Sequence, residues 1–403
     1  MNKKELGIYI HIPFCKKKCY YCDFVSYANN CKNVEEYIKT VIKEIESYNL
    51  ENYNITTIYI GGGTPSYIDS KYIVEILAKL KQKLQNNETK FNNIEITIEV
   101  NPGTVTEDKL RTYKNLGVNR LSIGLQSTED KILKQIGRIH CYDDFLNTYK
   151  IAREVGFKNI KDQKELDELL QSIVSSPTNY MSARDSEGNE YAEFTLEKII
   201  KLEPEPPNHI SVYSLIVEEN TPIEKMLESG ELELPDEELE RNMYWYVKNF
   251  LELNGYKHYE ISNFAKLGNE SKHNLDCWNQ KEYVGFGVAA HSYIDDVRYG
   301  NIGNVEEYIK NCENGEFGKN KVIDEVENDI FSKEKEFMLI GLRKIEGVLI
   351  QDFKNKFGEN PIFVFKDELK KLVDENLLIV DFDRIKLTNK GLDLANIVWE
   401  NFV

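Results

Sequence analysis

The first half of the chain repeats one pattern, in which a short apolar segment is followed by a segment with apolar residues every three or four positions. The short segments are typical of β-strands and cover residues 7–12, 57–60, 94–100 and 120–125. The segments with helical spacing cover residues 34–48, 72–84, 107–116 and 145–155. Repeated strand–helix units favour a parallel sheet with right-handed crossovers. We therefore expect an α/β fold with functional residues at the carboxyl ends of its strands.

Three cysteines come directly after the first predicted strand. Cys15, Cys19 and Cys22 have the spacing C-x3-C-x2-C. Cysteine thiolates hold iron–sulfur clusters, and a cubane cluster usually takes four of them. A triplet leaves one iron for a non-protein ligand, as an open metal site does in catalysis. The spacing therefore indicates a 4Fe-4S cluster with one open coordination position.

Two other interpretations of these cysteines are less favoured. A zinc site needs four ligands, so His11 or Cys31 would have to supply the fourth. A disulfide framework is disfavoured because the chain has only 7 cysteines in 403 residues, which is sparse and odd in number.

The sequence around the triplet carries a resemblance to a known family. The run Tyr-Ile-His-Ile-Pro-Phe precedes Cys15, and Asp23 and Phe24 follow the third cysteine. These motifs resemble the radical S-adenosyl-L-methionine (SAM) superfamily, in its branch similar to oxygen-independent coproporphyrinogen III oxidase, and within that branch the HemW haem chaperones. The resemblance implies an incomplete (β/α)6 barrel, a 4Fe-4S cluster on Cys15, Cys19 and Cys22, SAM on the open iron, and haem as a further ligand.

Several polar or small residues follow the predicted strands. The run from Gly61 to Pro65 removes side chains where a backbone could approach a ligand, although a glycine triplet alone is more often a tight turn. The planar fork of Arg138 suits a carboxylate, whereas Glu99 by itself could be a surface carboxylate. The resemblance implies that SAM is bound by Gly62, Gly63, Thr64, Glu99, Gln126 and Arg138. It also implies contacts from Tyr9 and Tyr21, for which core packing is the alternative.

Residues 161–194 depart from the family pattern. Relatives have a strand with an aspartate here, whereas this chain has a polar run from Lys161 to Glu165. The spacing of Leu166, Leu169, Leu170 and Ile173 then predicts a helix. We therefore predict that the barrel lacks this strand or forms it poorly, and that SAM binding is weakened.

A second motif lies at residues 273–278, where the sequence is His-Asn-Leu-Asp-Cys-Trp. It resembles the H-N-L-x-Y-W motif of HemW proteins, with Cys277 where tyrosine is usual. Histidine and cysteine both serve as axial ligands of haem iron. The resemblance implies His273 as a haem ligand, with Cys277 as an alternative, although a lone histidine is more often a hydrogen-bonded structural residue.

The last part of the chain has a different pattern. Helical spacing covers residues 333–343, 350–357 and 362–373, and a hairpin is predicted over 377–387, with Thr388 as the cap of a last helix. This order resembles a winged-helix α+β domain. Its basic and acidic residues nearly balance, so a cover for the barrel or a protein contact is favoured over DNA binding. The expected domains are a barrel at 1–225, a middle region at 226–330 and this domain at 331–403.

Composition restricts the partners and the compartment. A net charge of −17 argues against nucleic acid, whose phosphates would repel the protein. The chain has neither an apolar run of about 18 residues nor a signal peptide, so we expect a cytoplasmic protein. Loose membrane association and dimerisation stay open. The resemblance implies haem-acceptor proteins and an electron donor such as a flavodoxin or ferredoxin as partners. Lys16, Lys17 and Lys18 form either a docking patch for that donor or a solvated loop.

Two classes of function follow from the resemblance. The first is a haem chaperone, which receives haem and transfers it to an apoprotein. The alternative is an oxygen-independent coproporphyrinogen III oxidase or another radical SAM enzyme. Relatives with the oxidase activity carry a fourth cysteine where this chain has Phe24, so the sequence favours the chaperone.

Overall fold

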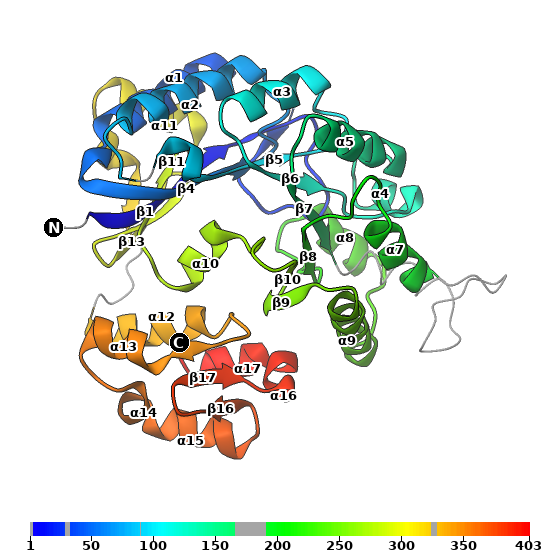
Figure 1. Ribbon diagram of the computed structural model, residues 1–403, viewed down its shortest axis with the longest axis vertical. Coiled ribbons are helices and arrows are strands. Elements are labelled where there is room, and N and C mark those ends of the chain that lie inside the picture. The colour runs from blue at the N-terminus through cyan, green and yellow to red at the C-terminus, as the bar shows by residue number, and fades with distance from the viewer. Residues whose placement is uncertain (1–2, 29–32, 89, 166–190, 324–328) are drawn as a thin grey trace.

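The computed structural model of the protein describes residues 3–28, 33–88, 90–165, 191–323 and 329–403. A sheet of parallel strands forms its larger part, with helices on one face and a smaller domain against the other (Figure 1). The six strands of the repeating units are β1 (Lys4–Ile12), β4 (Tyr53–Gly62), β5 (Glu95–Val100), β6 (Arg120–Gly124), β7 (Asn159–Glu165) and β8 (His209–Tyr213). They pair in parallel in that order, which confirms the predicted incomplete (β/α)6 barrel.

Further strands extend this sheet at both ends. On one side β1 pairs in parallel with β11, and antiparallel strands continue from it; on the other side β8 pairs with a hairpin. The added strands are β11 (Tyr283–Phe286), β12 (His291–Ile294), β13 (Val297–Asn301), β14 (Lys321–Ile323), β10 (Asn263–Ala265) and β9 (Lys257–Glu260). Within the described residues the sheet begins at β14 and ends at β9, so the barrel stays open along one side.

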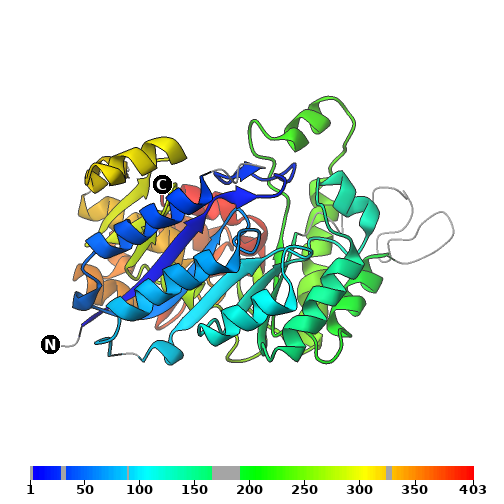
Figure 2. The ribbon, with the colours of Figure 1, turned by 90° about the horizontal axis from the view of Figure 1, so that it is seen from above.

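The connecting helices cover the outer face of the sheet, as Figures 1 and 2 show. They are α1 (Val34–Ser47), α2 (Ser70–Lys83), α3 (Glu107–Asn115), α4 (Asp130–Gln135), α5 (Tyr142–Glu154) and α7 (Tyr191–Ile200). Helix α1 shows why the periodicity was informative, because Tyr37, Ile38, Val41 and Ile45 form a buried stripe toward the sheet. Periodicity missed α4, which is too short to repeat an apolar pattern.

Strand β7 corrects the prediction that the barrel lacks a strand after residue 160 or forms it poorly. The backbone of β7 pairs in parallel with β6 and β8, with Asp162 opposite Ile123 on one side and Ile210 on the other. A polar run gives a weak strand signal, but hydrogen bonding to two neighbouring strands overrides local propensity. The weakened SAM binding inferred from a missing strand therefore loses its basis. The helix predicted around Leu166 to Ile173 lies outside the described residues.

The remaining helices of the larger part follow the barrel in the chain. They are α8 (Pro222–Glu228), α9 (Glu237–Leu253), α10 (Lys272–Trp278) and α11 (Val305–Glu313). Helix α10 lies on the inner side of the sheet, between the parallel strands and the C-terminal domain (Figure 1). No helix in the described ranges is both long and apolar enough to cross a membrane.

The C-terminal domain has a hydrophobic core of its own. Its elements are α12 (Ile330–Gly341), β15 (Val348–Leu349), α13 (Ile350–Phe357), α14 (Pro361–Val364), α15 (Lys366–Asp374), β16 (Leu378–Val380), β17 (Arg384–Leu387), α16 (Asn389–Asp393) and α17 (Ala395–Glu400). The strands form a small antiparallel sheet, which confirms the winged-helix-like α+β fold. The predicted cap is also present, since the Thr388 hydroxyl accepts from the backbone N–H of Gly391 at 2.8 Å.

The C-terminal domain is attached to the β9–β10 hairpin and to α9. The backbone N–H of Ile261 donates to the carbonyl of Arg343 at 3.1 Å, and that of Ile345 donates to the carbonyl of Tyr259 at 3.2 Å. The indole N–H of Trp245 donates to Asp393 at 2.8 Å. These bonds hold the domain against the inner side of the sheet, next to α10.

A buried carboxylate fastens α1 to the turn that follows β11. Glu44 accepts hydrogen bonds from the Tyr308 hydroxyl at 2.6 Å, from the Gly287 backbone N–H at 2.8 Å and from the Asn301 amide at 3.0 Å. Burial raises the pKa of Glu44. This one side chain accepts from all three donors, so it joins residues far apart in the chain.

We expect the substitution Glu44→Ala to lower the free energy of unfolding by about 2–4 kcal/mol, because three buried donors lose their acceptor. Urea unfolding followed by circular dichroism measures the loss. Glu36→Ala changes an exposed carboxylate of the same helix and should cost less than about 0.5 kcal/mol. Equal losses in the two variants would contradict the role assigned to Glu44.

Candidate functional site

A cavity of about 590 Å³ opens at the carboxyl ends of the parallel strands. Eleven of the twelve site residues predicted from the sequence line it, and His273 is the exception. These eleven are Tyr9, Cys15, Cys19, Tyr21, Cys22, Gly62, Gly63, Thr64, Glu99, Gln126 and Arg138. Residues spread over more than a hundred positions therefore face one cavity, as the common direction of the strands predicts.

The pairing of β1 with β4 continues past the ends of both strands and positions the first cysteine. The backbone N–H of Gly63 donates to the carbonyl of Ile12 at 2.9 Å, and that of Thr64 donates to the carbonyl of Phe14 at 3.0 Å. A Cβ atom on Gly63 would lie 2.9 Å from the carbonyl carbon of Pro13 and 3.0 Å from the Cys15 sulfur. Glycine is therefore required where the segment after β4 approaches the segment after β1, next to the Cys15 sulfur.

A chain of hydrogen bonds connects two of the cysteines. The Cys15 sulfur lies 3.4 Å from the Thr64 hydroxyl, which accepts from the Asn101 amide at 3.0 Å. The amide oxygen of Asn101 accepts from Arg138 at 2.9 Å, and Arg138 also donates to the Cys19 sulfur at 3.5 Å. The guanidinium is oriented further by the carbonyl of Gly124, at 2.8 Å. Positive charge is thus held beside a thiol that would bind iron as a thiolate.

Glu99 is oriented from two sides. One carboxylate oxygen accepts from the Tyr59 hydroxyl at 2.7 Å, and the other accepts from the Gly62 backbone N–H at 3.2 Å. Gly62 has a φ of +111°, and a Cβ there would come within 2.7 Å of the His11 ring. The glycine therefore permits the turn that brings its N–H to the carboxylate.

Gln126 has two features of a ligand-binding residue. Its backbone has a φ of +67°, which is uncommon for a residue with a side chain. Its amide oxygen is buried and has no hydrogen-bond partner among the described residues. Such strain and such an orphaned polar atom occur together where a ligand completes the site.

These residues fit a 4Fe-4S cluster with SAM beside it. Three thiols line one cavity, and Cys15 sits above a glycine that leaves room for its sulfur. Within the described ranges, no three histidine, cysteine or acidic side chains are grouped as ligands of one metal ion. A cubane binds each thiolate at a different iron, so it takes more widely spread sulfurs than zinc does. Burial raises the pKa of Cys22 to about 11, and bound iron would favour its thiolate.

His273 lies on α10 and does not line this cavity. Its ring stacks on Tyr59, with centroids 5.3 Å apart, and its Nδ1 lies 2.8 Å from the Thr57 hydroxyl. Its backbone N–H donates to Glu95 at 3.1 Å. The histidine is therefore buried against β4 and β5, away from the cavity of the cysteines.

Sequence reasoning gave no role to Asn101 and Trp278, which also line the cavity. Asn101 follows β5 directly, so the rule that singled out the other strand-end residues could have found it. Trp278 ends the second motif, and only the docking of α10 inside the barrel places it at the cavity.

An open barrel of parallel strands, with three cysteines in a cavity at their carboxyl ends, defines a radical SAM protein. Residues 9–163 match the model of the Radical SAM superfamily, and residues 334–394 match that of the HemN C-terminal domain. In solved structures, the chain resembles coproporphyrinogen III oxidase (HemN) from Escherichia coli with a TM-score of 0.77 and 20% identity. That match covers 99% of this chain and 90% of the other.

Two relatives show which family of radical SAM proteins the chain belongs to. The chain is 34% identical to Heme chaperone HemW of Lactococcus lactis, over 100% of this chain and 98% of the relative. It is 34% identical to Heme chaperone HemW of Bacillus subtilis, over 98% of each chain. The chain belongs to the HemW family.

The substitution Gly63→Ala is expected to lower the iron and sulfide bound after reconstitution by at least about twofold, because the added methyl group would occupy the space beside the Cys15 sulfur. Iron and acid-labile sulfide analysis with Mössbauer spectra measures this. Gly318→Ala is the control, since a Cβ there meets open space. Normal cluster content in Gly63→Ala would contradict the geometry.

Burial lowers the pKa of His273 to about 4, whereas the unfolded chain has an ordinary histidine pKa near 6.5. The folded state therefore resists protonation, so this stability is fully present above pH 6.5 and is lost as the pH falls toward 4. We expect the wild type to lose about 2 kcal/mol more than His273→Gln between pH 7 and pH 5.

Urea unfolding at the two pH values measures the difference between the proteins. His11, His140 and His258 also have a pKa lowered to about 4, mainly by burial. They are present in both proteins, so the difference isolates His273. Equal losses would show that this histidine becomes protonated without cost in the folded state.

Proposed function

We propose that the protein is a haem chaperone, which binds haem and transfers it to acceptor apoproteins. The observation that carries this proposal is the 34% identity over the whole chain to a relative named Heme chaperone HemW. The barrel and its cavity supply the radical SAM scaffold on which the chaperone is built.

The cavity is proposed to hold a 4Fe-4S cluster on Cys15, Cys19 and Cys22, with SAM beside it. When bound and reduced, such a cluster supplies an electron that cleaves the sulfonium bond of SAM. The guanidinium of Arg138 lines the cavity, and its positive charge suits the carboxylate of SAM. Glu99 supplies acceptors for the amino group or the ribose of SAM.

The remaining predicted residues shape the same cavity. Gly62, Gly63 and Thr64 bring the backbone after β4 close to the ligand, and Gln126 offers its orphaned amide oxygen. Tyr9 and Tyr21 line the cavity near the cluster loop. Together these residues would bind and orient SAM and limit the access of water.

The alternative, a coproporphyrinogen III oxidase, is disfavoured by one residue. Phe24 stands where relatives with that activity carry a fourth cysteine, and its side chain lines the cavity with 62% of its surface exposed. A phenyl ring can neither bind iron nor donate a proton, so it cannot replace that cysteine chemically.

The proposed partners follow from the chaperone role. They are haem, a haem-acceptor protein and a one-electron donor such as a flavodoxin or ferredoxin, in the cytoplasm. Lys17 and Lys18 line the cavity that holds the cysteines. An acidic donor that docks on them would come close to the cluster.

Titration of the anaerobically reconstituted protein with hemin tests the proposal. We expect a saturable Soret band and no loss of coproporphyrinogen III when SAM and a reductant are added. Transfer of the bound haem to an apo-haem protein should follow, measured by the shift of the Soret band. Consumption of coproporphyrinogen without haem uptake would contradict the chaperone and support the oxidase.

The variant His273→Ala separates two roles of the histidine in the same titration. An axial ligand would alter the position or intensity of the Soret band when it is removed. A structural histidine would leave the spectrum unchanged, and the variant would only unfold at a lower urea concentration.

A further inference from the structure

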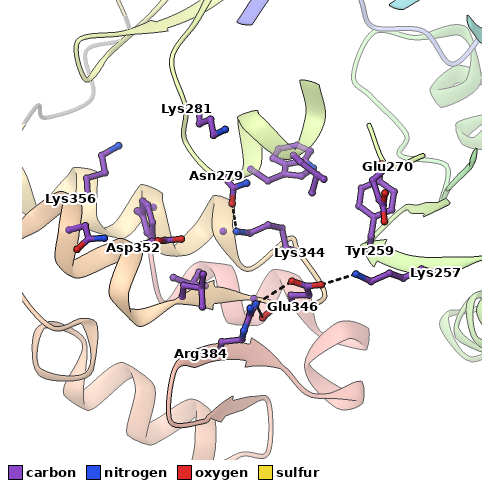
Figure 3. A pocket seen from close by; sticks show the side chains of 18 residues that line it. Lys257, Tyr259, Glu270, Asn279, Lys281, Lys344, Glu346, Asp352, Lys356 and Arg384 are labelled. Carbon is purple, nitrogen blue, oxygen red and sulfur yellow. Dashed lines mark hydrogen bonds and ion pairs between the residues drawn. The ribbon is translucent and has the colours of Figure 1, made fainter. Parts of the chain in front are cut away.

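A second cavity, of about 690 Å³, lies between α10 and the C-terminal domain. Residues of β9 and α10 line one side, and residues of α12, α13, β17 and the turn before β15 line the other (Figure 3). We name this cavity the interdomain cleft. Its volume falls within the range of about 300–1,000 Å³ that is usual for pockets binding small molecules.

The interdomain cleft is rich in positive charge, although the chain has a net charge of −17. Its cationic lining residues are Lys257, Lys281, Lys344, Lys356 and Arg384, against the acidic residues Glu270, Glu346 and Asp352. Cationic side chains from both sides of the interface thus line the same cavity. This arrangement favours an anionic ligand over a cationic one.

Most of these cations are already paired. Lys257 lies 2.7 Å and Arg384 lies 3.3 Å from Glu346. Lys281 pairs with Asp276 at 2.9 Å, and Lys356 pairs with Asp296 at 3.5 Å. They neutralise carboxylates of the protein, so their charge is not fully available to a ligand.

Lys344 differs from the others. In the described part of the chain, no carboxylate lies within ion-pair distance of its ammonium group, which donates instead to the amide oxygen of Asn279 (Figure 3). The side chain is half-buried, and burial lowers its pKa. Asp352 and Glu346 of the interdomain cleft act on this ammonium only from beyond ion-pair distance, so a carboxylate from a ligand would give it a direct ion pair.

The interdomain cleft also has apolar lining residues on both sides, beside the polar Asn279 and Asn355. Leu275 and Trp278 of α10 lie on one side, and Phe337, Val348 and Leu349 of the C-terminal domain lie on the other. A ligand suited to this lining has a large apolar body and carboxylates at its edge. Haem, a flat macrocycle with two propionates, has both properties.

We propose that the interdomain cleft binds haem and that Lys344 pairs with one of its propionates. The proposal rests on the proposed function, which supplies haem as the ligand. It assigns the haem site to the space between α10 and the C-terminal domain, and not to the cavity of the cysteines.

Trp278 is a fluorescent reporter for a ligand in the interdomain cleft or in the cavity of the cysteines. Its indole lines both cavities, and its buried N–H has no acceptor among the described residues. The guanidinium of Arg343 lies 4.6 Å from its ring centre and 5.3 Å from that of Trp399. Haem in the interdomain cleft would contact Trp278 and quench its fluorescence.

The test is a hemin titration of the full-length reconstituted protein, followed by the Soret band and by tryptophan fluorescence. Lys344→Gln should weaken hemin binding about tenfold, the usual effect of removing one charged hydrogen bond. Lys344→Arg, which keeps the charge, should bind nearly as the wild type does. Lys319→Gln removes an exposed lysine outside the interdomain cleft and should have no effect.

Hemin dimethyl ester, which lacks the propionate charges, completes the design. It should bind the wild type more weakly than hemin does, and Lys344→Gln should weaken its binding no further. In Trp278→Phe, hemin should quench less of the remaining fluorescence than it quenches in the wild type.

The outcomes separate the two proposals. Equal hemin affinity in the wild type and in a folded Lys344→Gln overturns the site in the interdomain cleft and leaves the chaperone function standing. Absence of hemin binding by the wild type overturns the proposed function and the site with it. If Lys344→Gln weakens the binding of hemin but not that of its dimethyl ester, the result supports both the chaperone function and the haem site.

Discussion

The chain of hydrogen bonds from Cys15 through Thr64, Asn101 and Arg138 to Cys19 is the contact on which the rest of the site depends. Its members come from the segments that follow β1, β4 and β5 and from the turn after α4. The two sulfurs are therefore oriented by the ends of several strands as well as by their own loop. A site held in this way inherits the rigidity of the sheet, which a cofactor that must be placed accurately requires.

Helix α10 divides the inner side of the molecule into two compartments. His273 faces the strands and stacks on Tyr59, whereas Leu275 lines the interdomain cleft. Trp278 at its end lines both cavities. The helix is short and capped by Ser271, so the contacts at its two sides determine its position more than its own propensity does. A ligand in either cavity thus meets the same structural element.

Local patterns in the sequence were sufficient to predict most strands and helices of the barrel and most residues of the cofactor cavity. Residues such as Thr64, Glu99 and Gln126 could be singled out because each ends a strand or follows it closely, and parallel strands bring these positions to one edge. The same reasoning failed at β7, where a polar run hides a strand. There the neighbours β6 and β8 supply the hydrogen bonds that local composition does not predict.

The sequence by itself determined the α/β class, the three thiols and the edge of the sheet at which the cofactor residues meet. Only the tertiary structure decided that His273 is buried against Thr57 and that Lys344 reaches Asn279 across the interdomain cleft. The physical reason is the range of the contacts. Strand direction and periodicity are local properties of the chain, whereas the partners of these two side chains are set by how α10 and the C-terminal domain pack against the sheet.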